Sequence, residues 1–116
     1  MRIALAQLNY HVGNFDYNKE KIINHIEKAK NDQVDLIIFS EASVCGYPPQ
    51  DLLEYRNFIE ECDYSVKEIA SHCRGIAAIV GGPRINPSPR GKQLLNSAFF
   101  LEDGKIQSVQ DKTLLP

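Results

Sequence analysis

The stretch Leu36-Ile37-Ile38-Phe39-Ser40-Glu41 decides the fold, because it joins a short apolar segment to a carboxylate. The run from Val34 to Phe39 is nearly continuous in apolar residues, as expected of a parallel strand covered on both faces. Glu41 follows at its carboxyl end, where α/β proteins place reacting groups. The next turn, Gly46-Tyr47-Pro48-Pro49, can be neither helix nor central strand. The stretch therefore predicts an α/β sheet with a functional group at one strand end.

The segments on either side predict the order β-α-β-α-β-β-β. The hydrophobic periodicity and the positions of Gly, Pro and Asn give the boundaries. The expected strands are Ile3–Leu8, Val34–Phe39, Ile76–Val80, Asn96–Leu101 and Ile106–Gln110, and the expected helices are Tyr17–Lys30 and Arg56–Cys73. Gly13-Asn14-Phe15-Asp16 is expected to form a turn and helix cap, Gly81 to Gly91 is expected to be a polar loop, and Asp103-Gly104 predicts a tight hairpin turn. Two helices over five strands would leave one face or edge of the sheet open.

The bulk composition is that of an ordinary globular domain. The 116 residues suit one domain, with 43% hydrophobic and 24% charged residues and a net charge of −2. There is no basic stripe for nucleic acid, and no amphipathic or long apolar segment for a membrane, so neither partner is expected. The start lacks a signal-peptide pattern, and a cytoplasmic location is expected.

The cysteines indicate neither a disulfide framework nor a metal site. Cys45, Cys62 and Cys73 are odd in number, and no pair forms a Cys-x-x-Cys motif. Cys62 and Cys73 share the apolar face of the second predicted helix and are expected to be small buried hydrophobes.

Lys112 follows the predicted hairpin, in Asp111-Lys112-Thr113-Leu114-Leu115-Pro116. A carboxylate and an ammonium at strand ends supply two of the three groups that an amidase site needs, and a nucleophile is not evident. Considered singly, Glu41 could be an exposed strand-end carboxylate, Lys112 a solvated lysine and Tyr47 a packing residue beside two prolines.

Together these segments resemble the nitrilase (carbon–nitrogen hydrolase) superfamily, and within it the glutaminase domain of glutamine-dependent NAD synthetases. The motifs that carry the resemblance are Ala4-Leu5-Ala6-Gln7-Leu8-Asn9, Phe39-Ser40-Glu41, Gly46-Tyr47-Pro48-Pro49-Gln50-Asp51-Leu52-Leu53, Gly81 with Pro83, Asn96-Ser97-Ala98 and Lys112-Thr113-Leu114-Leu115-Pro116. The resemblance implies an α/β fold, with this chain as the N-terminal half of an α-β-β-α sandwich that carries a Glu-Lys-Cys triad.

The resemblance also implies roles for individual residues. Glu41 matches the general base, Lys112 the catalytic lysine, and Tyr47 a tyrosine that helps hold glutamine. The family's nucleophilic cysteine lies further downstream, and Cys45 is no substitute for it. Residues 1–116 are therefore expected to be a partial domain, truncated before the nucleophile and inactive alone.

The function implied is glutamine hydrolysis that supplies ammonia for ATP-dependent amidation of deamido-NAD to NAD. No cofactor or metal is expected for the glutaminase part, whereas ATP and Mg are expected for a C-terminal synthetase domain, the main partner. A homo-oligomer is expected at full length. The alternatives are a stand-alone amidase or carbamoylase of the same superfamily, and a non-catalytic fragment that only binds or assembles.

Overall fold

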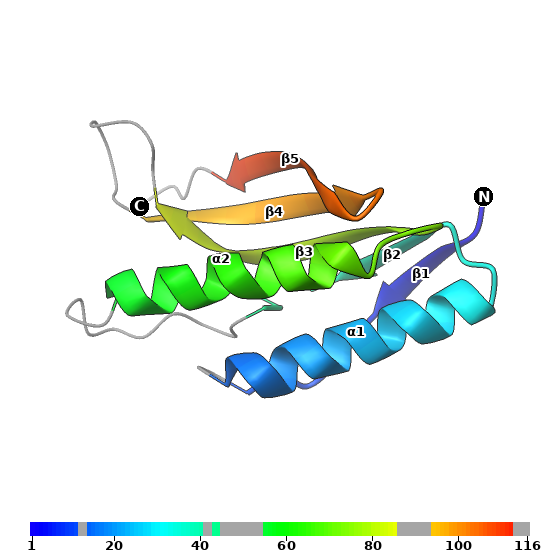
Figure 1. The fold of residues 1–116 in the computed structure, drawn as a ribbon, viewed down its shortest axis with the longest axis horizontal. Helices are drawn as coiled ribbons and strands as arrows, with labels where there is room; N and C mark the ends of the chain where they lie inside the picture. The colour runs from blue at the N-terminus through cyan, green and yellow to red at the C-terminus, as the bar shows by residue number, and fades with distance from the viewer. Residues whose placement is uncertain (12–13, 41–42, 45–54, 86–93, 113–116) are drawn as a thin grey trace.

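The computed structural model describes the backbone of residues 1–11, 14–40, 43–44, 55–85 and 94–112, and their side chains except those of 55–58, 85, 94–96 and 112. Five strands and two helices follow one another in the predicted order, β-α-β-α-β-β-β (Figure 1). They are β1 (Ile3–Ala6), α1 (Phe15–Asn31), β2 (Leu36–Phe39), α2 (Tyr55–Ser71), β3 (Ala77–Ile85), β4 (Leu94–Glu102) and β5 (Lys105–Lys112).

The strands form a single mixed sheet in the order β1-β2-β3-β4-β5. β1 pairs parallel with β2, and β2 parallel with β3. β4 runs antiparallel to β3, and β5 antiparallel to β4. As a consequence β1, β2, β3 and β5 all point the same way, and their carboxyl ends lie at one edge of the sheet. We call this edge the carboxyl edge.

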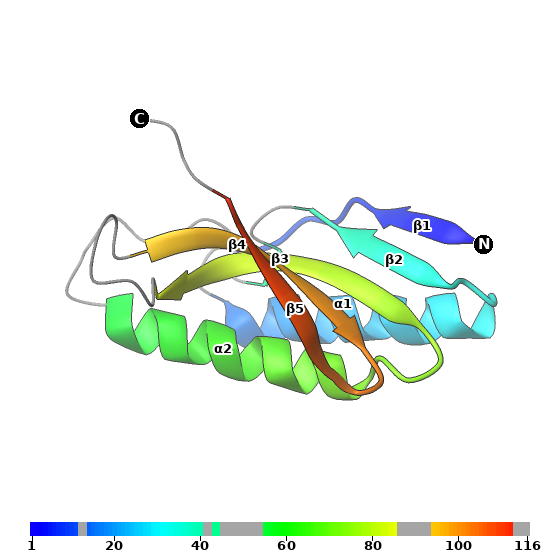
Figure 2. The ribbon, with the colours of Figure 1, turned by 90° about the horizontal axis from the view of Figure 1, so that it is seen from above.

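Both helices cover the same face of the sheet (Figure 2). The predicted apolar stripe of α1 is buried, with Ile22, Ile26 and Ala29 at most 6% exposed. The stripe of α2, which comprises Ile59, Cys62, Val66 and Ile69 with Cys73 just beyond the helix, is buried to the same degree. Each of the Ile and Val side chains in these stripes stabilises the fold by roughly 1.5–3 kcal/mol when fully buried. The core therefore lies between the helix layer and one face of the sheet.

The predicted cap begins α1. The Asn14 side chain accepts a 3.1 Å hydrogen bond from the backbone N–H of Tyr17. This bond satisfies one of the donors that every helix leaves unpaired at its first turn.

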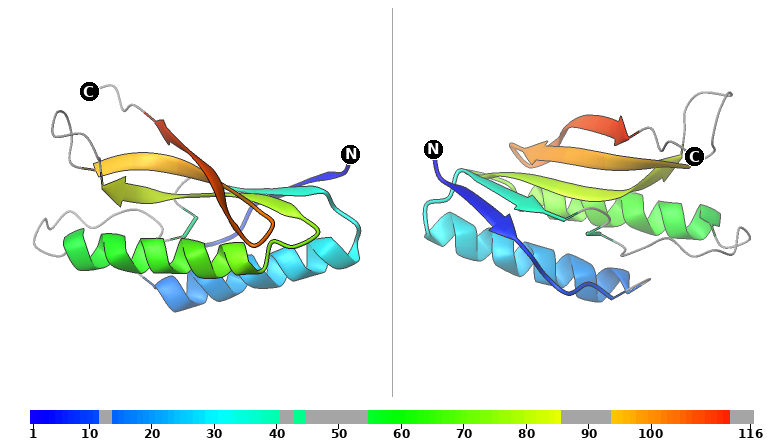
Figure 3. Two further views of the ribbon diagram at one scale, coloured as in Figure 1. Left: turned by 45° about the horizontal axis from the view of Figure 1, so that its top comes forward. Right: turned by 180° about the vertical axis from the view of Figure 1, so that it is seen from behind.

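The other face of the sheet has no described element over it (Figure 3). Ile3 and Leu5 of β1 are 55% and 75% exposed, while their neighbours Ala4 and Ala6 pack on the core. Within β2, Ile37 and Phe39 are buried, whereas Leu36 and Ile38 are only partly covered. The expectation that this strand is covered on both faces is thus met on one face only among the described residues.

The third strand is longer than the sequence predicted. We expected it to end at Val80, with a loop from Gly81, yet β3 continues through Pro83 to Ile85. The described β2–β3 pairing ends at Ile38 and Ile79, so the rest of β3 pairs with β4 on one side. A proline is tolerated in such an edge-like segment because one side of the strand needs no ladder donor.

The predicted Asp-Gly turn joins β4 to β5. Asp103 and Gly104 both have positive φ, at 56° and 78°. Two central residues of this kind are typical of a type I′ turn, whose twist matches that of the flanking strands.

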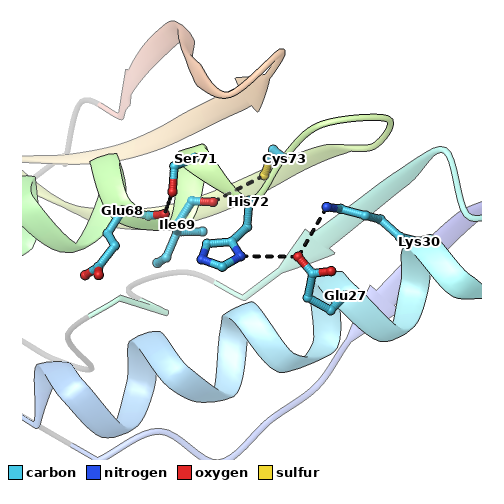
Figure 4. A network of polar contacts seen from close by, with 7 residues as sticks. All are labelled: Glu27, Lys30, Glu68, Ile69, Ser71, His72 and Cys73. Carbon is cyan, nitrogen blue, oxygen red and sulfur yellow. Dashed lines mark hydrogen bonds and ion pairs between the residues drawn. The ribbon is translucent and has the colours of Figure 1, made fainter.

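A small polar cluster joins the two helices at the end of α2 (Figure 4). The Glu27 carboxylate of α1 lies 3.2 Å from His72 Nδ1 and 3.2 Å from Lys30 Nζ. The hydrogen bond with His72, followed by the one with Lys30, lowers the pKa of Glu27. Because His72 precedes β3, this cluster lies at the opposite edge of the sheet from the carboxyl edge.

Candidate active site

The strand that precedes Glu41 and the strand that carries Lys112 both end at the carboxyl edge, with β3 and β4 between them. β2 ends at Phe39, two residues before Glu41, and β5 ends at Lys112. The two strands point the same way, so both segments leave the sheet at this edge. Glu41 and Tyr47 themselves lie outside the described residues. The backbone of Lys112 is described and pairs with Asn96 of β4.

Ser43 and Val44, which follow Glu41 in the sequence, lie beside β3. The backbone N–H of Gly81 donates a 3.0 Å hydrogen bond to the Ser43 hydroxyl, and the N–H of Val44 donates a 3.1 Å bond to the Gly81 carbonyl. Ser43 and Val44 are both fully buried. These two bonds hold Ser43 and Val44 beside β3, beyond the last described pair of β2 and β3.

Tyr10 lies at the same edge, beyond the carboxyl end of β1, and packs against the core. Its hydroxyl is shielded from solvent, and no described group meets full hydrogen-bond geometry with it. Burial raises the pKa of Tyr10, and interactions with the hydroxyl and backbone of Ser40 partly offset that rise. We take Ser40 to be a polar neighbour without a well-formed bond. Tyr10 therefore places a neutral phenol beside the residue that precedes Glu41.

An ionic network ties β3, β4 and β5 together at the carboxyl edge. The Arg84 guanidinium donates two parallel 2.6 Å hydrogen bonds, from Nε and Nη2, to the two carboxylate oxygens of Asp111. The Ser97 hydroxyl donates a third 2.6 Å bond to Asp111 Oδ1. We call these three residues the Asp111 network.

The Asp111 network is held in its charged form by its own hydrogen bonds. The bonds from Arg84, and next the bond from Ser97, lower the pKa of Asp111 to about 2. The same pairing raises the pKa of Arg84. The side chains of Arg84 and Asp111 are 33% and 30% exposed, so the pair is partly shielded from water. Arg84 also borders a hollow of about 400 Å³ between α2 and the last three strands.

No role was predicted for Tyr10, Arg84, Ser97 or Asp111. Ser97 stood within a motif that carried the family resemblance and Asp111 directly before another, but nothing in the sequence indicated that they touch. A turn at Asp103-Gly104 alone would place Ser97 opposite Gln110. A register shift between Phe100 and Leu101 brings Ser97 opposite Asp111 instead, so no local sequence signal indicated this pair.

Neither of the two described cysteines is placed to act as a nucleophile at the carboxyl edge. Cys62 and Cys73 are buried on the helix side of the sheet, as predicted. Burial raises the pKa of Cys73 to about 11, and its thiol donates to the Ile69 carbonyl at 3.6 Å. Cys45 lies outside the described residues.

In the described ranges, no group of three or more His, Cys, Asp or Glu side chains is arranged to hold a metal ion. Within the same residues, no helix has the length and apolar character needed to cross a bilayer.

A mixed sheet with both helices on one face defines an α/β domain. The family model for carbon–nitrogen hydrolases matches residues 2–116. The chain belongs to this carbon–nitrogen hydrolase family.

Relatives and solved structures agree with this assignment. The glutamine-dependent NAD(+) synthetase of Xanthomonas campestris is 36% identical over 117 residues, which cover all of this chain and 20% of that protein. The crystal structure of the glutamine-dependent NAD(+) synthetase from Cytophaga hutchinsonii superimposes with a TM-score of 0.86 at 26% identity, over all of this chain and 19% of that one. An amidase from Nesterenkonia sp. shares the fold at a TM-score of 0.77 and 21% identity, over all of this chain and 44% of that one.

These matches confirm the predicted fold class, an α/β chain that forms the N-terminal half of a nitrilase-type sandwich. The chain spans about one fifth of the length of the curated relatives it matches.

Proposed function

We propose that this chain forms part of a glutamine amidohydrolase domain that supplies ammonia for ATP-dependent amidation of deamido-NAD to NAD. The observation that carries the proposal is the similarity over the whole chain to glutamine-dependent NAD synthetases, at 36% identity to one of them. The convergence of the Glu41 and Lys112 segments on the carboxyl edge supports it. The synthetase part, with its ATP and Mg, would be supplied by a domain outside these 116 residues.

The roles of the two groups follow from the chemistry of amide hydrolysis. A carboxylate in a dry pocket has a raised pKa, so Glu41 would take the proton of a thiol and return it to departing ammonia. The thiolate would attack the amide carbon to form a thioester, which water activated by Glu41 would then hydrolyse to glutamate. The Lys112 ammonium would stabilise the tetrahedral oxyanion, a contribution of about 3 kcal/mol for one such donor. Tyr47 would contact the glutamine.

We propose that the nucleophilic cysteine comes from outside this chain. Neither described cysteine suits the role, because both are buried in the core and the pKa of Cys73 is far above neutral. The 116-residue chain alone is therefore expected to release no ammonia from glutamine.

The test is ammonia release by the full-length protein that carries this chain, with glutamine, asparagine, N-carbamoyl amino acids and simple aliphatic amides as substrates. We expect glutamine to have the highest kcat/KM, and Glu41→Gln to lower its kcat by roughly 10³-fold. Preference for another amide, with glutamine inert, would favour the stand-alone amidase. Absence of hydrolysis of every amide would favour a non-catalytic role.

A further inference from the structure

We propose that Arg84, Ser97 and Asp111 are positioning residues that fix the end of β5 and, through it, the backbone of Lys112. The catalytic part of this inference rests on the proposed function, because it takes Lys112 as the oxyanion donor. The structural part, that the network holds the end of β5 in place, stands on the geometry alone.

The first step is the position of the network along the strands. Asp111 directly precedes Lys112, and its partner across the ladder is Ser97. Lys112 in turn pairs with Asn96, the residue before Ser97. A displacement of Asp111 therefore moves Lys112 with it, because one peptide unit joins them and adjacent rungs of the ladder hold them.

The second step is that β5 needs such support. It is the last strand of the sheet and has only β4 as a described partner. Its side chains from Gln107 to Gln110 are exposed, so hydrophobic burial contributes little to holding its second half. Strand ends with few buried contacts open readily. Asp111 is the first residue after this exposed run that is partly buried and bonded to other strands.

The third step is the strength of the connection. Two parallel bonds from Arg84 fix both the distance and the plane of the Asp111 carboxylate, as bidentate guanidinium–carboxylate pairs do. The bond from Ser97, which lies on β4, holds the same carboxylate from a second side. Asp111 directly precedes Lys112 in β5, so fixing Asp111 constrains Lys112 through the backbone that they share. Lysine in place of Arg84 would keep the charge but lose the two-bond geometry.

The test uses the full-length protein and compares Asp111→Asn, Arg84→Lys and Ser97→Ala with Glu27→Gln. Glu27 is a matched control, because its carboxylate also joins two parts of the chain, through a 3.2 Å contact with His72 at the opposite edge of the sheet. Two readouts are taken: amide hydrogen exchange of residues 109–112 relative to α1, and kcat with KM for glutamine.

We expect exchange at residues 109–112 to accelerate about tenfold or more in Asp111→Asn, less in Arg84→Lys and Ser97→Ala, and not in Glu27→Gln. The kcat for glutamine should fall about tenfold to a hundredfold in Asp111→Asn with KM within about twofold, because a small displacement of a catalytic group has effects of this size. The double variant with Arg84→Lys and Asp111→Asn should lose no more kcat than Asp111→Asn alone, since the two residues act as one unit.

Unchanged exchange at residues 109–112 in Asp111→Asn would overturn the proposal, whatever the activity. Accelerated exchange with unchanged kcat would overturn its catalytic part. If the unaltered protein does not hydrolyse glutamine, the proposed function fails, and the exchange measurement still decides whether the network holds the end of β5.

Discussion

Ser97 and Asp111 face each other across β4 and β5, and the Ser97 hydroxyl donates a 2.6 Å hydrogen bond to Asp111 Oδ1. This contact, with the two bonds from Arg84, joins three strands at the edge where the segments carrying Glu41 and Lys112 leave the sheet. A structural connection between strands thus lies one residue away from a group with a proposed catalytic role.

Acid should weaken the Asp111 network within a defined range of pH. The pKa of Asp111 is about 2 in the folded protein, against an ordinary value of 3.8. Because the folded-state pKa is depressed, the contribution to stability is fully present above about pH 4 and is lost as the pH falls toward about 2. The denaturant concentration at which β4 loses half of its hydrogen-exchange protection should therefore differ between the unaltered protein and Asp111→Asn at pH 6. This difference should shrink below about pH 4. A difference that stays constant down to pH 2 would contradict this account.

Gly104→Ala should destabilise the hairpin, by about 1–2 kcal/mol. Gly104 has a φ of 78°, and a Cβ built there would lie 2.6 Å from Arg74 Nη2. Gly82→Ala is the matched control in the same sheet, because its Cβ would meet Phe99 and Val44 at ordinary contact distances of 3.7 and 3.8 Å. Denaturant unfolding followed by exchange in β4 and β5 measures both. Equal losses from the two substitutions would show that the positive-φ turn is not the cause.

The thiol of Cys73 should resist alkylation in the folded protein. It is fully buried, and burial raises its pKa to about 11, so the reactive thiolate is scarce at pH 8. Iodoacetamide at pH 8, followed by peptide mass spectrometry, should leave Cys73 unmodified in buffer and modify it fully in guanidinium chloride. Rapid modification in buffer would contradict the described packing of this residue.

Lys112→Met should lower the kcat for glutamine by roughly 10²–10³-fold, because it removes one oxyanion donor from the proposed site. Lys105→Met, at the start of the same strand and next to the turn, is the control and should change kcat by less than about twofold. Steady-state ammonia release measures both. Similar effects from the two substitutions would show that the loss comes from altered strand charge or packing.

The features that depend on neighbouring residues were predicted correctly from the sequence. Local periodicity and backbone preference explain the apolar run of β2, the stripes of both helices, the cap before α1 and the Asp103-Gly104 turn. The continuation of β3 through Pro83 was missed, because it depends on pairing with β4, which cannot be seen in the local sequence.

Only part of the candidate site was predicted from the sequence. The resemblance predicted roles for Glu41, Tyr47 and Lys112, which stay predictions, and the structure describes only the backbone of Lys112 among them. The Asp111 network was missed because its members are 14 and 27 residues apart along the chain, and only the register of three strands brings them together.

The most direct test of the proposed function compares nitrogen donors in the full-length protein. NAD formation from deamido-NAD and ATP is measured with glutamine or with ammonium, in the unaltered protein and in Glu41→Gln. We predict that the substitution abolishes glutamine-dependent synthesis and leaves ammonium-dependent synthesis within about twofold, because Glu41 would act only in releasing ammonia. Glutamine-dependent synthesis that persists in Glu41→Gln, or no synthesis from either donor in the unaltered protein, would contradict the account.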